Sequence, residues 1–290
     1  MFTGAMVALI TPFQDGEIDF RTLDELINFQ LENSIDAIVP VGTTGESPTL
    51  SHEEHKKVIE RVVKTVSGKV PVIAGAGSNS TAEAIELTAF SKKAGADATL
   101  QVGPYYNKPT QEGFYQHFKT IAEEVDLPIV LYNIPGRCGA GMTADTIVRL
   151  AEIENIIAIK EASGSLDQVS EIATRCDLTI LSGDDSLTLP IASVGGKGVI
   201  SVVANIVPAD VKAMTDLILE GDLVSARQWH SKLFSLCRSL LGLATNPIPI
   251  KAAMSMLNMA SEEMRLPMTP LEDSKKAALK QILSDYGLLK

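Results

Sequence analysis

The sequence has 290 residues, of which 45% are hydrophobic and 21% charged, and its formal net charge is −11. This length allows one or two domains, and an acidic chain without a basic stripe argues against nucleic acid as a partner. The three scattered cysteines, Cys138, Cys176 and Cys237, form no CxxC motif, so they predict neither a disulfide framework nor a zinc site.

Eight short apolar runs recur along the chain, with helical patterns between them. The runs are continuously apolar rather than alternating, which is typical of parallel strands covered on both faces. In chain order they lie at residues 5–11, 36–42, 70–75, 97–103, 128–133, 156–162, 178–185 and 198–203. Eight successive β-α units predict a (β/α)8 TIM barrel at residues 1–222, with a doubly wound open sheet as the alternative.

Helix starts are marked by serine-based patterns. Ser51 and Ser80 each precede a glutamate by three residues, as in a capping box, and Ser165 precedes a glutamine at the same spacing. From about Pro208 onward only helical periodicity remains, and it is broken near Pro247 and again near residue 266. We therefore expect the last barrel helix to be followed by a C-terminal helical extension at residues 223–290.

The N-terminus and the hydropathy pattern bear on location. The first residues, MFTGAMVALITPFQDGE, lack a basic region and reach a charged turn too early for a signal peptide. No apolar run approaches the roughly 18 residues that a membrane helix needs. We expect a cytoplasmic protein with no membrane partner.

Lys160 ends the sixth apolar run, directly after residues 156–159. Lysine is rarely buried without a partner, and burial lowers the pKa of its ammonium group. A neutral amine can attack a carbonyl and form a Schiff base, and barrel active sites lie at the carboxyl ends of strands. The alternative is a lysine that reaches water or pairs with Glu161, although adjacent strand residues point to opposite faces.

Other strand ends carry polar residues that suit such chemistry. Tyr132 ends the fifth run and can transfer protons, although a tyrosine packed in the core fits the same pattern. Thr43 and Thr44 lie in GTTGES and can relay protons or bind a carboxylate, or they build an ordinary glycine-rich turn. Arg137 in PGRCG suits a carboxylate, with a solvated surface arginine as the alternative.

Four motifs in chain order, GTTGE, YYNKP, YNIPGR and IKEASG, resemble those of the 4-hydroxy-tetrahydrodipicolinate synthase (dihydrodipicolinate synthase) family. The resemblance covers essentially the whole chain. It implies a lyase of the pyruvate-dependent class I aldolase superfamily, with pyruvate and L-aspartate 4-semialdehyde as substrates. Pyruvate would form an imine with Lys160, and the derived enamine would attack the semialdehyde. This reaction is the committed entry to diaminopimelate and lysine synthesis and uses no metal or external cofactor.

The resemblance also implies roles for the matching residues. Tyr132 is the central proton-transfer residue, and Thr43 links it to Tyr106 from a neighbouring subunit of a homotetramer, a dimer of dimers. Thr44 helps to hold the carboxylate derived from pyruvate. Arg137 steers the carboxylate of the semialdehyde. Two further positions have a backbone that faces the nucleophile and the substrate: Gly183 and Ile200.

One residue departs from the pattern. Cys138 follows Arg137, where threonine is more common in the family. A thiol at the mouth of a site can be oxidised or alkylated if its pKa is low. A packed, unreactive cysteine is the interpretation that we favour.

Lysine-inhibited members of the family bind L-lysine at the interface of the tight dimer. A glutamate there can pair with the amine of L-lysine, and a tyrosine and an asparagine can hold its carboxylate. The matching positions are Ser47, Pro48, His52, His55, Asn79, Glu83 and Tyr105. We expect L-lysine to be an inhibitor, although Pro48 lies where alanine is common. The alternative is that Glu83 serves only the capping box begun at Ser80, while His52 and His55 are surface residues.

Two other functions fit parts of the pattern. N-acetylneuraminate lyase and the 2-keto-3-deoxy sugar acid aldolases use the same lysine and tyrosine, but Arg137 and GTTGE argue against them. A non-catalytic ligand-binding barrel is the third hypothesis, because fold does not fix function. The intact Lys160, Tyr132, Thr43 and Tyr106 argue against it.

Overall fold

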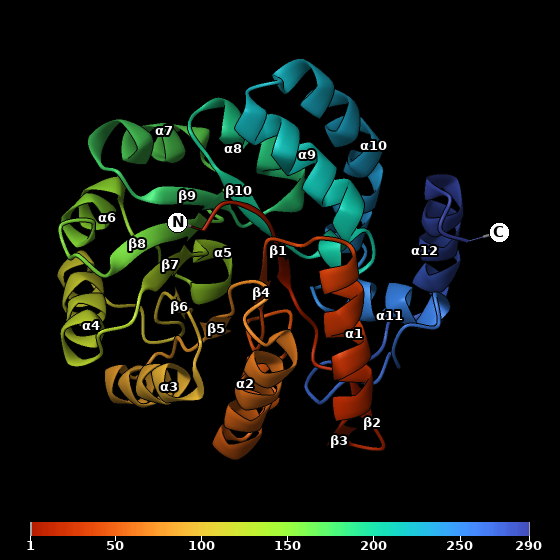
Figure 1. Ribbon diagram of the computed structural model, residues 1–290, viewed down its shortest axis with the longest axis horizontal. Coiled ribbons are helices and arrows are strands. Elements are labelled where there is room, and N and C mark those ends of the chain that lie inside the picture. The colour runs from red at the N-terminus through yellow and green to blue at the C-terminus, as the bar shows by residue number, and fades with distance from the viewer. Residues whose placement is uncertain (1, 290) are drawn as a thin grey trace.

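A computed structural model describes residues 2–289 and contains a barrel of eight parallel strands (Figure 1). The strands are hydrogen-bonded in the order β4-β1-β10-β9-β8-β7-β6-β5, and a parallel bridge from Ile38 to Val72 joins the two ends of this order. The barrel strands are β1 (Gly4–Ala8), β4 (Ala37–Val39), β5 (Ile73–Gly75), β6 (Ala98–Val102), β7 (Ile129–Asn133), β8 (Ile156–Glu161), β9 (Thr179–Ser182) and β10 (Gly198–Ser201). The predicted TIM barrel is confirmed, and the open sheet is wrong.

Helices surround the barrel (Figure 1). They are α1 (Phe20–Glu32), α2 (His52–Val66), α3 (Thr81–Ala94), α4 (Gln111–Glu124), α5 (Pro135–Cys138), α6 (Ala144–Leu150), α7 (Leu166–Arg175), α8 (Thr188–Ser193) and α9 (Pro208–Glu220). Short 3-10 turns lie at Ser47–Thr49, Asp185–Leu187 and Val203–Asn205. A small antiparallel hairpin, β2 (Phe13–Gln14) with β3 (Glu17–Ile18), was not predicted, because two residues per strand show no periodicity.

Strand β8 shows how the barrel directs Lys160. Ala158 belongs to the apolar cluster inside the barrel, together with Tyr132. Ile159 belongs to the cluster between the strands and the outer helices. Because strand side chains alternate, Lys160 shares the inner face with Ala158, and Glu161 faces outward. The register between β7 and β8 sets Lys160 beside Tyr132.

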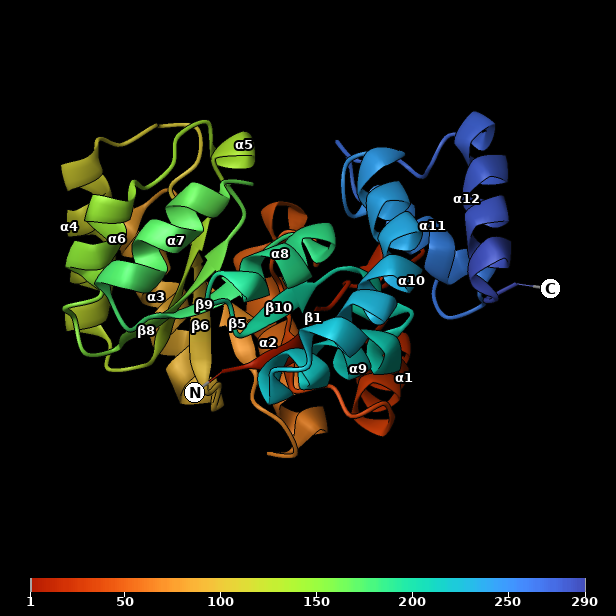
Figure 2. The same ribbon diagram turned by 90° about the horizontal axis from the view of Figure 1, so that it is seen from above.

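The C-terminal extension consists of α10 (Leu223–Gly242), α11 (Ile248–Met256) and α12 (Asp273–Tyr286). Figure 2 shows these helices on one side of the barrel, next to α9 and α1. Leu240 and Leu283 of the extension belong to the same buried cluster as Leu23 and Ile27 of α1. The predicted helical extension is confirmed, and it shares a hydrophobic core with the barrel.

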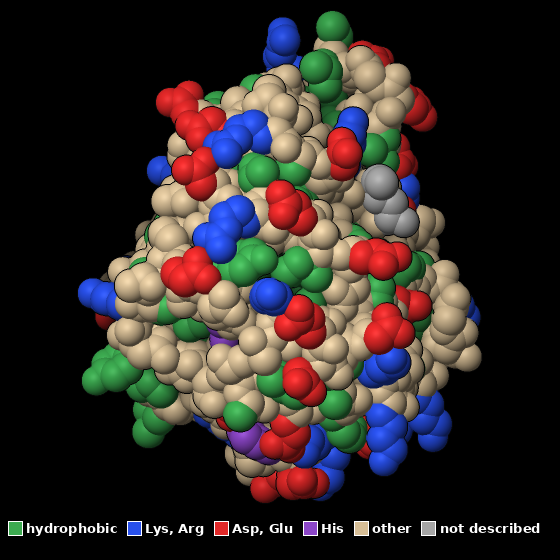
Figure 3. Space-filling view, turned by 90° about the vertical axis from the view of Figure 1, so that its left-hand side faces the viewer, with side chains coloured by type: hydrophobic (Ala, Val, Ile, Leu, Met, Phe, Trp, Pro, Cys, Tyr) green, Lys and Arg blue, Asp and Glu red, His purple; other side chains and the backbone are tan. Residues whose placement is uncertain are grey.

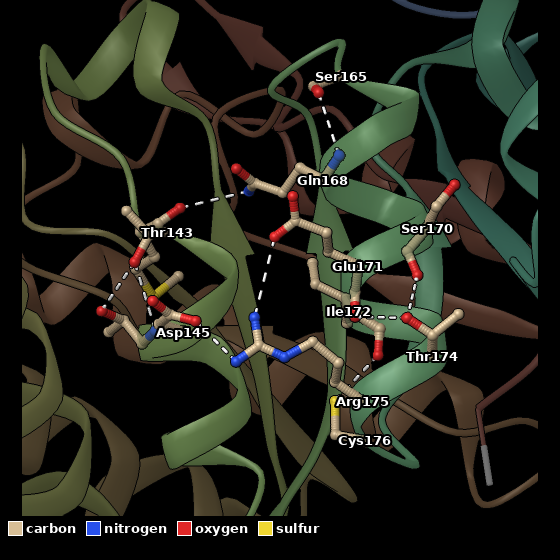
Figure 4. Close-up of polar contacts among 12 residues, drawn as sticks. Thr143, Asp145, Ser165, Gln168, Ser170, Glu171, Ile172, Thr174, Arg175 and Cys176 are labelled. Atoms are coloured by element: carbon tan, nitrogen blue, oxygen red, sulfur yellow. Dashed lines mark hydrogen bonds and ion pairs between the residues drawn. The ribbon is translucent and has the colours of Figure 1, made fainter.

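Two of the three predicted caps are present. The Ser51 hydroxyl accepts from the Glu54 amide while the Glu54 carboxylate accepts from the Ser51 amide, which completes the capping box at α2. Ser165 accepts from the Gln168 amide at the start of α7 (Figure 4). The predicted capping box at Ser80 is wrong: its side chain makes no capping bond, its amide donates to the Ser78 hydroxyl, and the Glu83 carboxylate pairs with His52 of α2.

Surface charges of both signs are mixed. On the face shown in Figure 3, acidic and basic side chains lie interspersed rather than in a stripe of one sign. Arg175 at the end of α7 illustrates such pairing, since it reaches Asp145 of α6 at 2.6 Å (Figure 4). Within residues 2–289, no helix combines the length and the hydropathy needed to cross a membrane.

Candidate active site

Lys160 is the buried amine at the centre of the barrel mouth. Lys160 is only 6% exposed to solvent, and its Nζ lies 4.3 Å from the centroid of the Tyr132 ring. Burial lowers the pKa of Lys160 to about 8; the charge of Asp185 acts against this, and that of Arg137 adds to it. Glu161 is engaged elsewhere, because its carboxylate accepts from Asn133. The amine therefore lies in an apolar barrel interior rather than in a pair with Glu161.

Tyr132 is the aromatic residue whose ring faces the Lys160 amine. It is buried inside the barrel near the end of β7, and burial raises its pKa to about 12, so its phenol stays protonated at neutral pH. The positive charge of Arg137 and a polar contact with the Thr43 side chain act in the opposite direction. Thr43 and Tyr132 also line the same small cavity of about 30 Å³. The phenol is thus protonated, and the ring that carries it lies against the Lys160 amine.

Thr44 and Arg137 are joined by a residue that the sequence did not single out. Asn246 lies between α10 and α11, and its Nδ2 donates to the Thr44 hydroxyl at 2.9 Å. Its backbone carbonyl accepts from Arg137 Nη2, also at 2.9 Å. Thr43, Arg137 and Asn246 line a cavity of about 200 Å³. Arg137 is solvent-exposed, and its guanidinium is tied to the C-terminal extension at the rim of this cavity.

Gly183 follows β9 and lies against the stem of Lys160, and Ile200 lies inside the barrel on β10. A Cβ at Gly183 would lie 2.7 Å from the Ala162 Cβ and 3.2 Å from the Lys160 Cε, so only glycine leaves the lysine stem its space. Ile200 is buried in the apolar cluster that contains Tyr132. Gly183 therefore leaves space for the lysine stem, and Ile200 adds to the apolar interior of the barrel.

Tyr106 is the one expected catalytic residue that this chain does not bring to the others. Tyr106 is 89% exposed to solvent, and its backbone φ is 73°, a value that is unusual for a residue with a large side chain. The loop therefore presents the tyrosine outward, away from the site of its own chain.

Cys138 is packed. Its thiol is buried and donates to the Gly103 carbonyl, with the Sγ and the oxygen 3.1 Å apart. Burial raises the pKa of Cys138 to about 11, so the thiolate is scarce at neutral pH. These observations favour the unreactive interpretation.

A second cavity, of about 130 Å³, lies beside the GTTGES turn. Six of the seven residues expected to hold L-lysine line it: Ser47, Pro48, His52, His55, Glu83 and Tyr105. The seventh, Asn79, borders it, since its Nδ2 donates to the backbone carbonyl of Tyr105 at 3.0 Å. Residues from α2, α3 and three connecting segments thus meet at one pocket.

Glu83 is the charged centre of this pocket. One carboxylate oxygen lies 2.5 Å from His52 Nε2, and the other accepts from the Ser78 hydroxyl. This cross-helix pairing replaces the capping box expected with Ser80. His55 is buried, and its Nε2 donates to the Gly75 carbonyl at 2.7 Å, so the surface interpretation is wrong for this histidine.

Asp185 is a second residue that the sequence analysis did not assign. Its buried carboxylate accepts from the amides of Val202 and Val203 at 2.9 and 3.3 Å. Its negative charge favours the protonated form of Lys160 and so limits the fall of the Lys160 pKa. Over residues 2–289, no three His, Cys, Asp or Glu side chains are grouped so that they could hold a metal ion.

The chain was compared with known protein families and with solved structures. A model of the Dihydrodipicolinate synthetase family matches residues 1–286. The chain belongs to this family. A 4-hydroxy-tetrahydrodipicolinate synthase of Syntrophobacter fumaroxidans is 54% identical over 292 aligned residues, which cover 100% of both chains. The family consists of lyases of the class I aldolase type, so the chain is an enzyme of this class.

Solved structures of the family superimpose closely. Dihydrodipicolinate synthase from Aquifex aeolicus is 51% identical, with a TM-score of 0.97 over 99% of each chain. The chloride-inhibited enzyme of Acinetobacter baumannii, complexed with pyruvate, is 42% identical with a TM-score of 0.97 over 100% of each chain. The enzyme of Cyanidioschyzon merolae with lysine bound is 44% identical, with a TM-score of 0.96 over 99% of each chain.

Proposed function

We propose that this chain condenses pyruvate with L-aspartate 4-semialdehyde, as a 4-hydroxy-tetrahydrodipicolinate synthase at the entry to diaminopimelate and lysine synthesis. Lys160 Nζ attacks C2 of pyruvate, and the carbinolamine loses water to give an imine. Loss of a proton from C3 gives the enamine, whose C3 forms a bond to the aldehyde carbon. The amino group of the semialdehyde then attacks C2, which closes the ring and releases the lysine.

The buried amine is the observation that carries this proposal. With a pKa of about 8, roughly a tenth of Lys160 is neutral at pH 7, whereas an ordinary lysine with a pKa of 10.5 would be almost entirely protonated. Tyr132 moves protons in the carbinolamine and enamine steps because its phenol is protonated and adjacent. Both substrates carry carboxylates, and Thr44 and Arg137 are available to hold one each.

Reductive trapping tests the imine. Borohydride added with pyruvate leaves one reduced adduct on the protein, and peptide mass spectrometry locates it. The adduct is expected on the peptide that contains Lys160, and Lys160→Ala is expected to abolish it. Lys197→Ala, which removes an exposed lysine, is the matched control and keeps the adduct. An adduct retained in Lys160→Ala would refute the assignment of the nucleophile.

The acceptor is tested by pyruvate consumption with L-aspartate 4-semialdehyde, beside a parallel reaction with N-acetylmannosamine. Consumption with the semialdehyde alone is the expected result. Arg137, fixed by Asn246 at the cavity, supports this acceptor because its guanidinium suits a carboxylate. Consumption with the sugar alone would overturn the acceptor but leave the imine chemistry in place, and consumption with neither would favour a non-catalytic barrel.

L-lysine inhibits the enzyme at the pocket around Glu83. The carboxylate is positioned to pair with an amine, and the lysine-bound structure of the Cyanidioschyzon merolae relative supports this ligand. Glu83→Gln is expected to raise the half-inhibitory L-lysine concentration at least about tenfold, since it removes the charge partner. Glu86→Gln, one turn along α3 and exposed, is the matched control. If L-lysine does not inhibit the wild-type enzyme, the proposal of an inhibitory site at this pocket is wrong.

Tyr106 acts in the site of a neighbouring subunit of a homotetramer. Its outward placement supports this arrangement. If Tyr106 serves across a dimer, mixing inactive Lys160→Ala with inactive Tyr106→Phe creates one complete site per mixed dimer. We expect such mixtures, after dissociation and reassociation, to regain activity. Mixtures that stay inactive would place Tyr106 outside the partner site.

A further inference from the structure

The GTTGES turn holds Thr43 and Thr44 between two residues with unfavourable backbone angles. Val41 has a φ of 47° and Glu46 a φ of 54°, and neither is a glycine. Val41 is β-branched, so the left-handed region is especially unfavourable for it. Such angles persist only where the surrounding contacts determine them. The contacts that hold this turn therefore decide where the two threonines lie.

A buried ion pair is the main contact on the far side of the turn. The Glu46 carboxylate meets the Lys251 ammonium of α11, and the two side chains are 2% and 0% exposed. Lys251 Nζ also donates to the Glu263 carbonyl at 2.8 Å and lies 4.3 Å from the centroid of the Phe13 ring. A pair of opposite charges removed from water has few alternative arrangements, because each charge needs its partner.

Arg265 extends the same network along the chain. Its backbone amide donates to the second Glu46 oxygen at 3.3 Å, and its Nη1 donates to the Thr49 carbonyl at 3.1 Å. Its guanidinium forms a two-point pair with Glu54, at 2.8 and 2.5 Å, which lowers the pKa of Glu54 to about 2. The turn and the start of α2 are thus both held by the C-terminal extension.

We infer that Glu46 and Lys251 are positioning residues, which fix the turn carrying Thr43 and Thr44 against α11 so that these threonines can serve the reaction at Lys160. The inference rests on the proposed function. Glu46 borders the cavity that Thr43 and Arg137 line, but its carboxylate bonds to Lys251 and to the Arg265 amide and is itself only 2% exposed. The pair acts through the threonines, and Asn246 of the same extension supports Thr44 directly.

Lys251→Met and Glu46→Gln test this role, because each removes one charge and keeps a side chain of similar length. Each variant is expected to lower kcat at least about tenfold, as misplaced catalytic groups do. The final fraction of Lys160 trapped with pyruvate by borohydride is expected to be unchanged, because Lys160 lies on β8 and not on the turn. The double variant is expected to recover part of the lost kcat, because it leaves no unpaired buried charge.

Asp24→Asn is the matched control, since it breaks the Asp24–Arg61 pair between α1 and α2, away from the site. It is expected to lower Tm without changing kcat. If Lys251→Met and Glu46→Gln likewise lower Tm and leave kcat at the wild-type value, the pair is only structural and the inference is overturned.

Two further outcomes are informative. If the single variants do not fold, the double variant supplies the measurement, and a wild-type kcat in that variant overturns the inference. If the wild-type enzyme itself does not condense pyruvate with the semialdehyde, the proposed function fails, and the positioning role fails with it.

Discussion

Replacing Lys160 by methionine is expected to stabilise the fold while abolishing imine formation. Burial lowers the Lys160 pKa from 10.5 to about 8. At pH 7 the amine is mainly protonated in both the folded and the unfolded chain, so the folded state bears the cost of a buried charge. At about 1.4 kcal/mol per pKa unit, this cost is roughly 3 kcal/mol. Methionine keeps an apolar stem in the barrel and removes the charge.

The pH dependence distinguishes this effect from ordinary repacking. Between pH 8 and 10.5 the unfolded chain binds more protons at this lysine than the folded chain does, so wild-type stability rises with pH in that window. The free energy of unfolding of Lys160→Met is therefore expected to exceed that of the wild type by roughly 3 kcal/mol at pH 7 but by only about 1 kcal/mol at pH 10.

Urea unfolding at both pH values, at one protein concentration, measures the difference in the free energy of unfolding. Lys197→Met, at an exposed lysine, is the control and is expected to change little. Two results would refute the idea that a charge buried at Lys160 destabilises the fold: a Lys160→Met variant less stable than wild type, or a gain in stability that is the same at both pH values.

Three further results are expected. The initial rate of pyruvate trapping rises with pH up to about 8 and then levels off, because only neutral Lys160 attacks; a rate still rising at pH 10 would contradict the lowered pKa. Gly183→Ala lowers kcat by up to about 100-fold, because its Cβ crowds the Lys160 Cε; unchanged kinetics would show that the barrel adapts. Iodoacetamide at neutral pH labels Cys138 slowly and leaves activity intact, since its pKa is about 11; rapid inactivation prevented by pyruvate would indicate a reactive thiol.

The barrel could be predicted from the sequence because its strands are covered on both faces. In β7, Val130 lies inside the barrel and Leu131 lies under the outer helices, so both are apolar and the run is continuous. The convergence of Lys160 and Tyr132 follows from this, since neighbouring parallel strands end at the same edge.

Local sequence patterns did not predict the contacts of side chains that bond to a partner far away in the sequence. Ser80 and Glu83 have capping-box spacing, but Glu83 bonds to His52, which lies 31 residues earlier. Asn246 and Lys251 reach their partners Thr44 and Glu46 across 202 and 205 residues. Such contacts leave no periodic signal in one sequence, so the role of the extension at the turn appears only in three dimensions.

The two buried lysines Lys160 and Lys251 differ in the partners that surround their amines. Lys251 is more deeply buried than Lys160, and burial lowers its pKa too, but the Glu46 carboxylate opposes this shift and, with the Glu263 carbonyl, accepts hydrogen bonds from its ammonium. Lys160 faces an aromatic ring and apolar strands, and Asp185 opposes the loss of its proton only through its charge. The difference lies in the hydrogen-bond acceptors offered to the charged form. One lysine fixes the turn, and the other is left free to react.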